Sequence, residues 1–176
     1  MSINVGFFAM PDYNDAKGIR AKKIASAAVI AAAIAIPAEG LRQWAYEDIA
    51  NPKLMTVCYG STTNVQKGVK YSLDECKARL DADMLAAVQA VDRCAPGLPV
   101  PVLAAFGDAV YNLGPRIACD TAHSTAARLL KAGDLAGACQ QLPRWNRATV
   151  AGQMIELPGL TKRRAKEMAL CLEGVA

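Results

Sequence analysis

Histidine is almost absent from this sequence: the 176 residues include a single one, His123. None of the six cysteines stands at the C-x-x-C spacing. Zinc and iron–sulfur sites in proteins are usually built from residues of these two types at such spacings. The sequence therefore predicts no metal site and no cofactor, and it favours a structural role for His123.

Cysteine is also missing from the first 57 residues, so any role of this residue belongs to the rest of the chain. Two interpretations remain open. The cysteines are either reduced thiols in a cytosolic core or three disulfides in an oxidising compartment, which requires that the chain leave the cytoplasm. The six are Cys58, Cys76, Cys94, Cys119, Cys139 and Cys171.

Charge is missing from residues 24–38, which read IASAAVIAAAIAIPA, whereas residues 17–23 carry four basic side chains. A basic stretch before an apolar run keeps its basic end in the cytoplasm and sends the following chain outside. Fifteen helical residues reach only about 22 Å, short of the roughly 30 Å hydrocarbon core. We interpret residues 24–38 as a weak, retained membrane anchor behind a cytoplasmic lead, residues 1–23.

Two alternatives to a retained anchor stay open. The triplet Ala33-Ile34-Ala35 has the small-residue pattern of a signal-peptide cleavage site. An Ala-rich core helix is the other alternative, but the run is apolar on all faces and shows no amphipathic stripe. If the anchor is released intact, we expect it to pack against or beside the small lobe described below.

The composition is that of a folded protein with one ordinary domain. Hydrophobic residues make up 53% and charged residues 20% of the chain, which argues against disorder. The net charge of +4 suits an anionic partner, and nucleic acid, a membrane surface and wall carboxylates all fit it. No internal repeat or low-complexity tract follows residue 39.

Helical signals dominate after residue 39. Ser72-Leu73-Asp74-Glu75 is a capping box, and the apolar residues behind it recur every three or four positions, which predicts a helix of about 20 residues ending before Pro96. Further helices are predicted over 102–113, 124–131, 134–142 and 161–173, the last capped by Thr161. Residues 55–59 are β-prone. We expect an α+β fold: a small lobe with a short hairpin, a long connecting helix and a helical C-terminal lobe.

Two carboxylates stand at the start of the predicted domain, which spans residues 39–176. Glu39 is expected to open a short helix, and Asp48 to follow it at a turn before the hairpin. Glycosidic bond cleavage needs a protonated acid at the leaving oxygen and a second carboxylate that activates water or attacks the sugar. Such a pair can flank a cleft, although most acids are solvated surface charges.

The surrounding residues strongly resemble the phage lysozymes of glycoside hydrolase family 24, in family order from residue 39 to about 173. Residues 24–38 resemble the signal-anchor-release segment carried by a subset of these endolysins. The matching stretches are Glu39-Gly-Leu-Arg42, Ala45-Tyr46-Glu-Asp48, Thr56-Val-Cys-Tyr-Gly60, Tyr111-Asn112-Leu113-Gly114, Leu129 to Asp134, Gly137-Ala-Cys139, Arg144-Trp145, and Gly159-Leu160-Thr-Lys-Arg163-Arg164 with Glu167.

The resemblance implies a fold, a reaction and residue roles. Glu39 would be the general acid, Asp48 would hold water or stabilise the transition state, and Thr56 would orient that water. The reaction would be single-displacement, inverting hydrolysis of the β-1,4 bond between N-acetylmuramic acid and N-acetylglucosamine in peptidoglycan, serving host lysis and phage release. Substrate contacts would come from Tyr111, Asn112 and Ser61, and Arg163 or Arg164 would pair with Glu39 unless both belong to a solvated basic face.

Two departures from the family pattern are visible. Seven residues separate Asp48 from Thr56, which is longer than usual. A histidine often follows the glycine at position 60, but Ser61 stands there, so any support that this histidine gives the acid is lost or replaced.

In the layout that the resemblance implies, the cysteine positions favour three of the fifteen full pairings: Cys58–Cys76, Cys94–Cys119 and Cys139–Cys171. We expect a monomer that binds peptidoglycan and no nucleic acid. It is anchored and inactive in the host inner membrane and then released to the periplasm. A holin-like permeabilising protein and a non-catalytic wall-binding module are the alternative functions.

Overall fold

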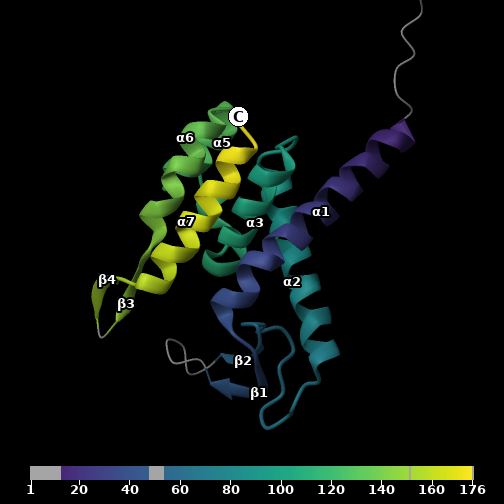
Figure 1. Cartoon of the computed structure of the whole chain (residues 1–176), viewed down its shortest axis with the longest axis vertical. Helices are drawn as coiled ribbons and strands as arrows, with labels where there is room; N and C mark the ends of the chain where they lie inside the picture. Colours follow the sequence, from purple (N-terminus) through teal and green to yellow (C-terminus); the bar gives the residue numbers. More distant parts are fainter. Residues whose placement is uncertain (1–12, 48–53, 151, 176) are drawn as a thin grey trace, which may run out of the picture.

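A computed structural model describes residues 13–47, 54–150 and 152–175 of the chain (Figure 1). It has a small lobe built on a hairpin and a larger lobe of packed helices, which confirms the α+β prediction. The small-lobe hairpin pairs β1 (Arg42–Glu47) with β2 (Met55–Cys58) in antiparallel register. The β-prone segment is thus a strand. The prediction that a short helix begins at Glu39 is wrong, because Glu39 is followed by Gly40 and Leu41 and then by β1.

The long connecting helix α2 (Leu73–Cys94) begins at the predicted capping box. Ser72 Oγ accepts a hydrogen bond from the Glu75 amide at 3.2 Å, and the Glu75 carboxylate accepts one from the Ser72 amide at 2.6 Å. Both bonds satisfy amides that the first helical turn leaves without an intrahelical partner. The apolar stripe that follows, from Leu80 through Met84 to Val91, is buried in the core.

The helix α3 (Val100–Leu113) lies at the centre of the helical lobe, where α1, α2 and α7 pack around it (Figure 1). Residues 102–110 of α3 are all buried. A glycine is required where α2 crosses α3, because a Cβ at Gly107 would lie 2.5 Å from Val88 Cγ2. This contact keeps the two helices close and holds the position of α3 fixed.

The remaining elements form the far side of the helical lobe. A second hairpin, β3–β4, was not predicted, and it projects beside the start of α7 (Figure 1). The predicted cap Thr161 is wrong: α7 begins after Leu157, and Thr161 lies within its first turn. The elements are α4 (Arg116–Cys119), α5 (Thr125–Ala132), α6 (Leu135–Gln141), the 3-10 helix η1 (Leu142–Trp145), β3 (Arg147–Val150), β4 (Gln153–Glu156) and α7 (Pro158–Glu173).

The N-terminal helix α1 (Tyr13–Glu39) runs unbroken through the predicted boundaries at residues 23 and 38 and packs on α2, α3 and α7. The expected position against or beside the small lobe is therefore wrong. The helix does have two different faces, but both are apolar. Small residues face inward, and large apolar residues face outward. The buried residues are Ala27, Ala28, Ala31, Ala32 and Ala35, and the exposed ones include Ile19, Val29, Ile30 and Ile36.

An ion pair fastens the basic end of α1 to α2. Arg20 donates from Nε to Asp92 Oδ2 at 2.7 Å, and its Nη2 lies 2.6 Å from the same oxygen. The Asp92 side chain is 6% exposed, so this carboxylate is nearly buried in the docked state. Lys23 adds a hydrogen bond to the Gly97 carbonyl at 3.2 Å.

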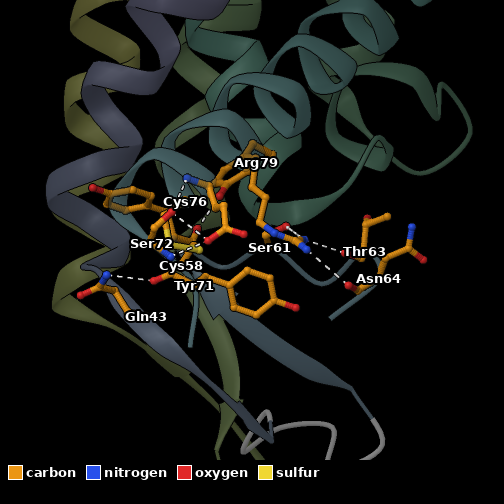
Figure 2. The surroundings of a disulfide bond; sticks show 12 residues. Gln43, Cys58, Ser61, Thr63, Asn64, Tyr71, Ser72, Cys76 and Arg79 are labelled. Atoms are coloured by element: carbon orange, nitrogen blue, oxygen red, sulfur yellow. Dashed lines mark hydrogen bonds between the residues drawn. A yellow bond between two sulfur atoms is a disulfide. The ribbon is translucent and has the colours of Figure 1, made fainter. Parts of the chain in front are cut away.

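Three disulfides tie the elements together, and they are the pairs that the sequence layout favours. Cys58–Cys76 joins β2 to α2 in the small lobe (Figure 2). Cys94–Cys119 joins α2 to α4, and Cys139–Cys171 joins α6 to α7. The bonds close 18, 25 and 32 positions of sequence. In the chain-entropy account each stabilises the fold by about 3 kcal/mol.

We predict that the inward and outward faces of α1 respond oppositely to added bulk. Ala31→Leu places a larger side chain where the native one is fully buried, so overpacking should lower the free energy of unfolding by about 1–3 kcal/mol. Ala33→Leu makes the same chemical change on the exposed face and should leave that free energy nearly unchanged. Urea denaturation of the oxidised, soluble protein measures both; equal effects would show that α1 is not docked through its alanines.

Candidate active site

A pocket opens between the small lobe and the helical lobe, and Glu39 lies at its edge. Both lobes contribute residues to its lining, so the pocket exists only when they are held together. The lining residues are Glu39, Tyr46, Thr56, Gly60, Thr62, Tyr111 and Asn112. Four of the residues expected at the site, Glu39, Thr56, Tyr111 and Asn112, are thereby brought together.

Glu39 is the last residue of α1, and its carboxyl group is held at one oxygen. Oε1 accepts hydrogen bonds from Arg163 Nη1 and, at 3.5 Å, from Asn112 Nδ2. The side chain is 25% exposed, so it is accessible from the pocket. The other oxygen, Oε2, faces Gly60, where an added Cβ would lie 3.6 Å away. Gly60 has φ +94°, a conformation that favours glycine, so this close approach is built into the turn.

Of the two arginines considered, Arg163 is the one that binds Glu39. Its guanidinium also forms a two-pronged pair with Asp108, from Nε at 2.8 Å and from Nη2 at 2.7 Å. Burial alone would lower the pKa of Arg163, but the hydrogen bonds and charges of Asp108 and Glu39 outweigh burial and raise it. Arg163 therefore stays charged and joins the C-terminal end of α1 to the centre of α3. The alternative interpretation, in which Arg163 belongs to a solvated basic face, is thus wrong, because this residue is only 4% exposed.

Arg164 turns the other way and is fully buried beneath the site. Its Nη2 donates to Asn112 Oδ1 at 3.0 Å and lies 2.7 Å from Glu167 Oε1. Asn112 is thereby oriented with its amide nitrogen toward Glu39. Burial raises the pKa of Glu167 well above its ordinary value, the neighbouring Asp108 raises it further, and Arg164 lowers it by less. Because an arginine stays protonated at ordinary pH, Glu167 is the member of this pair that gains a proton.

Tyr111 forms the side of the pocket opposite the small lobe. Its hydroxyl donates a hydrogen bond to the Tyr59 carbonyl, which connects α3 directly to the turn after β2. Burial raises the pKa of Tyr111, and the nearby Glu39 charge adds to this rise. The phenol is therefore neutral and acts as a donor, with its ring lining the pocket.

Thr56 lies on β2 with its side chain directed to the pocket. Its Oγ1 is buried and, among the residues that the structure describes, has no hydrogen-bond partner. A buried hydroxyl of this kind is available to a water or a substrate group. Asp48, the second predicted carboxylate, lies outside the described residues.

Ser61, expected to contact substrate, is buried behind the pocket wall, and its Oγ accepts a hydrogen bond from Arg79 Nη1 at 3.5 Å. The residue beside it, Thr62, lines the pocket instead.

His123 lies on the helical lobe, where Nδ1 is 2.9 Å from Asp120 Oδ2. Sequence reasoning missed Asp108, whose only signal is an acid in an otherwise apolar helix.

Comparisons with known proteins identify the family. The family described as phage lysozyme matches residues 37–167. A SAR-endolysin of Bacteriophage PS119 is 36% identical over 138 residues, which cover 77% of each chain. The muramidase domain of SpmX from Asticaccaulis excentricus superposes with a TM-score of 0.70 at 26% identity, covering 81% of this chain and 94% of that one. The active form of P1 phage endolysin Lyz gives 0.68 at 25% identity, covering 85% of each.

The chain therefore belongs to the phage lysozyme family. It is a glycoside hydrolase of the lysozyme type.

The raised pKa of Glu167 predicts a pH dependence of stability. Below about pH 4.5 the Glu167 carboxyl group is protonated in both the folded and the unfolded chain. Above that pH the unfolded chain releases the proton whereas the folded chain keeps it. The stabilisation that Glu167 contributes is therefore lost as pH rises. Glu167→Gln mimics the protonated form and should flatten the decline between about pH 5 and pH 9. Thermal melts across that range test this. A variant that is much less stable, with the slope unchanged, would show that Glu167 is ionised.

Proposed function

We propose that the chain is an endolysin that hydrolyses the β-1,4 bond between N-acetylmuramic acid and N-acetylglucosamine in bacterial peptidoglycan. Its family membership supports glycoside hydrolysis. The observation that carries the proposal is the Glu39 carboxyl group, held by Arg163 and Asn112 at the edge of a pocket between two lobes. The enzyme acts as a monomer, without nucleic acid, and its lysis of the host wall releases phage.

Glu39 acts as the general acid in this reaction. Its Oε1 already accepts hydrogen bonds from Arg163 and Asn112, so the transferable proton belongs on Oε2, the oxygen that faces Gly60. Protonation of the leaving glycosidic oxygen then breaks the bond as an oxocarbenium-like sugar develops. A water held by Asp48 and the Thr56 hydroxyl attacks the anomeric carbon from the opposite face and gives its proton to the Asp48 carboxylate, which inverts the anomeric centre.

A membrane-permeabilising protein and a non-catalytic wall-binding module are the competing functions. Neither requires a carboxyl group oriented by a buried arginine at the mouth of a pocket. The buried Arg163–Asp108 pair is costly to assemble unless its geometry is fully satisfied, and here the third guanidinium nitrogen, Nη1, donates to Glu39. That arrangement favours catalysis over either alternative.

Removing the acid should abolish hydrolysis and leave the fold intact. Glu39→Gln keeps the hydrogen-bonding shape and loses the transferable proton, so we predict a loss of at least about 100-fold in turnover of purified peptidoglycan. Glu47→Gln, which changes an exposed carboxylate on β1, is the matched control and should retain activity. Near-normal release of reducing ends by Glu39→Gln would assign the acid to another residue.

The helix α1 also serves as a membrane anchor before release. It is, in the part of the chain that the structure describes, the one helix long and apolar enough to cross a membrane. Its uncharged part is residues 24–38, about 22 Å of helix, so the span is short and its hold on lipid is weak. Lys17, Arg20 and Lys22 precede this apolar run on the same helix and favour the cytoplasmic side. In this state the chain is attached to the host inner membrane.

The anchored enzyme is inactive because α1 cannot span the bilayer and dock on the helical lobe at the same time. While α1 spans the bilayer, its alanine face has left α2, α3 and α7, and Glu39 lies at the membrane edge, away from Arg163. Collapse of the membrane potential frees the basic end and releases the helix, which then docks in the periplasm. Release completes the pocket by bringing Glu39 to its arginine.

Stronger membrane insertion should therefore delay lysis. Leucine at Ala25 and Ala33 adds roughly 0.3–0.6 kcal/mol of favourable insertion at each site. Both residues are exposed in the docked helix, so the released fold tolerates the change. We predict that cells producing Ala25→Leu/Ala33→Leu lyse later than wild type after an uncoupler is added, whereas serine at the same sites causes no delay. Lysis of the leucine variant on the wild-type schedule would contradict the anchor.

A further inference from the structure

Arg79, on the second turn of α2, spreads its guanidinium over the loop that follows β2. Nη1 donates to the Thr63 carbonyl at 2.7 Å and to Ser61 Oγ at 3.5 Å, and Nη2 donates to the Asn64 carbonyl at 3.3 Å. Figure 2 shows the side chain reaching from the helix toward these three residues. One side chain thus binds three residues of the loop, Ser61, Thr63 and Asn64.

The same guanidinium also holds the far end of this loop. Its carbon lies 4.6 Å from the centre of the Tyr71 ring, a stacking distance for a cation on an aromatic face. Tyr71 in turn accepts a hydrogen bond from the Gln66 amide through its hydroxyl at 3.0 Å. Arg79 therefore connects the start and the end of residues 61–71 and closes the loop against α2.

The loop has little other regular support among the described residues. Its backbone pairing consists of the isolated bridges Val57–Ser61 and Trp44–Lys70. Asn64 adopts φ +51°, in the left-handed region that asparagine enters more readily than most residues. The disulfide Cys58–Cys76 fixes only the chain before the loop, and two backbone hydrogen bonds with Val57, both at 2.9 Å, fix Ser61. The contacts from Arg79 therefore act mainly on Thr63 and Asn64, the residues that follow Thr62.

This part of the chain is also the small-lobe wall of the catalytic pocket. Gly60 and Thr62 line the pocket, and Thr62 lies between two residues that Arg79 binds. We infer that Arg79 is a positioning residue for glycan binding, which sets the Gly60–Thr62 wall through the hydrogen bonds to Ser61, Thr63 and Asn64. The inference rests on the proposed function, because it assigns the pocket to the glycan.

Loss of Arg79 should weaken substrate binding more than it slows the chemical step. Without the hydrogen bonds from Arg79, the glycan has to order the Gly60–Thr62 wall as it binds. The conformational entropy lost in that ordering weakens the binding free energy. Glu39, Arg163 and Asn112 keep their contacts, because none of them touches the loop through Arg79. KM for a soluble peptidoglycan fragment should therefore rise about tenfold in Arg79→Met, with kcat within about twofold and the pH profile unchanged.

Two further variants separate positioning from general stability. Arg79→Lys keeps the charge and one donor group and should recover KM to within about threefold of wild type. Arg128→Met is the matched control, because Arg128 makes the same kind of contacts, to the carbonyls of Thr121 and Ala122 at 3.1 and 3.3 Å, on a loop away from the pocket. Its KM should equal that of wild type.

A binding measurement keeps this inference distinct from the proposed function. The affinity of the same fragment, measured by calorimetry in the inactive Glu39→Gln background, should fall about tenfold when Arg79→Met is added. An unchanged KM and affinity in Arg79→Met, or an equal change in Arg128→Met, would overturn the role of Arg79. Failure of the wild-type chain to release reducing ends from peptidoglycan would instead overturn the proposed function.

Discussion

The buried guanidinium of Arg163 is the contact on which the rest of the site depends. It binds Asp108 in the middle of α3 through Nε and Nη2, and its third nitrogen, Nη1, donates to Glu39 at the end of α1. Desolvating this charge is costly, so it is stable only when its carboxylates are in place. The same interaction therefore joins three helices and orients the acid. Its completion requires that α1 be docked.

In the anchoring that we propose, α1 has to meet two sets of demands with one sequence. A membrane span must be apolar on all faces, whereas a core helix must fit closely against its neighbours. Alanine satisfies both at Ala27, Ala31 and Ala35, since it is apolar enough for lipid and small enough to let α3 approach. In the proposed anchor the larger residues Val29 and Ile36 would strengthen the hold on lipid, and in the docked helix they are exposed. The low hydrophobicity of each alanine would keep insertion weak enough to reverse.

Much of the fold and part of the site could be predicted from the sequence, and the failures have physical reasons. The capping box Ser72–Glu75 and the apolar periodicity behind it located α2 because those signals are local. The docked position of α1 was missed because a stripe of alanine on an apolar helix produces no contrast in polarity. Asp108 gave only the weak signal of an acid in an apolar helix, and the family match included Glu167 without a role. The roles of both arise from contacts between helices distant in sequence. The family motif located Glu39 and Thr56, but not the loop contacts of Arg79.

In the anchoring that we propose, docking of α1 creates the active site. This central claim is tested most directly by the turnover of a soluble peptidoglycan fragment by the full-length chain, first embedded in nanodiscs and then after transfer to buffer without lipid. The fragment reaches the enzyme freely in both states, so access to the wall plays no part. The account predicts no turnover in nanodiscs and full turnover after release. Equal turnover in the two states would show that Glu39 is already in place while α1 spans the membrane, and would contradict the account.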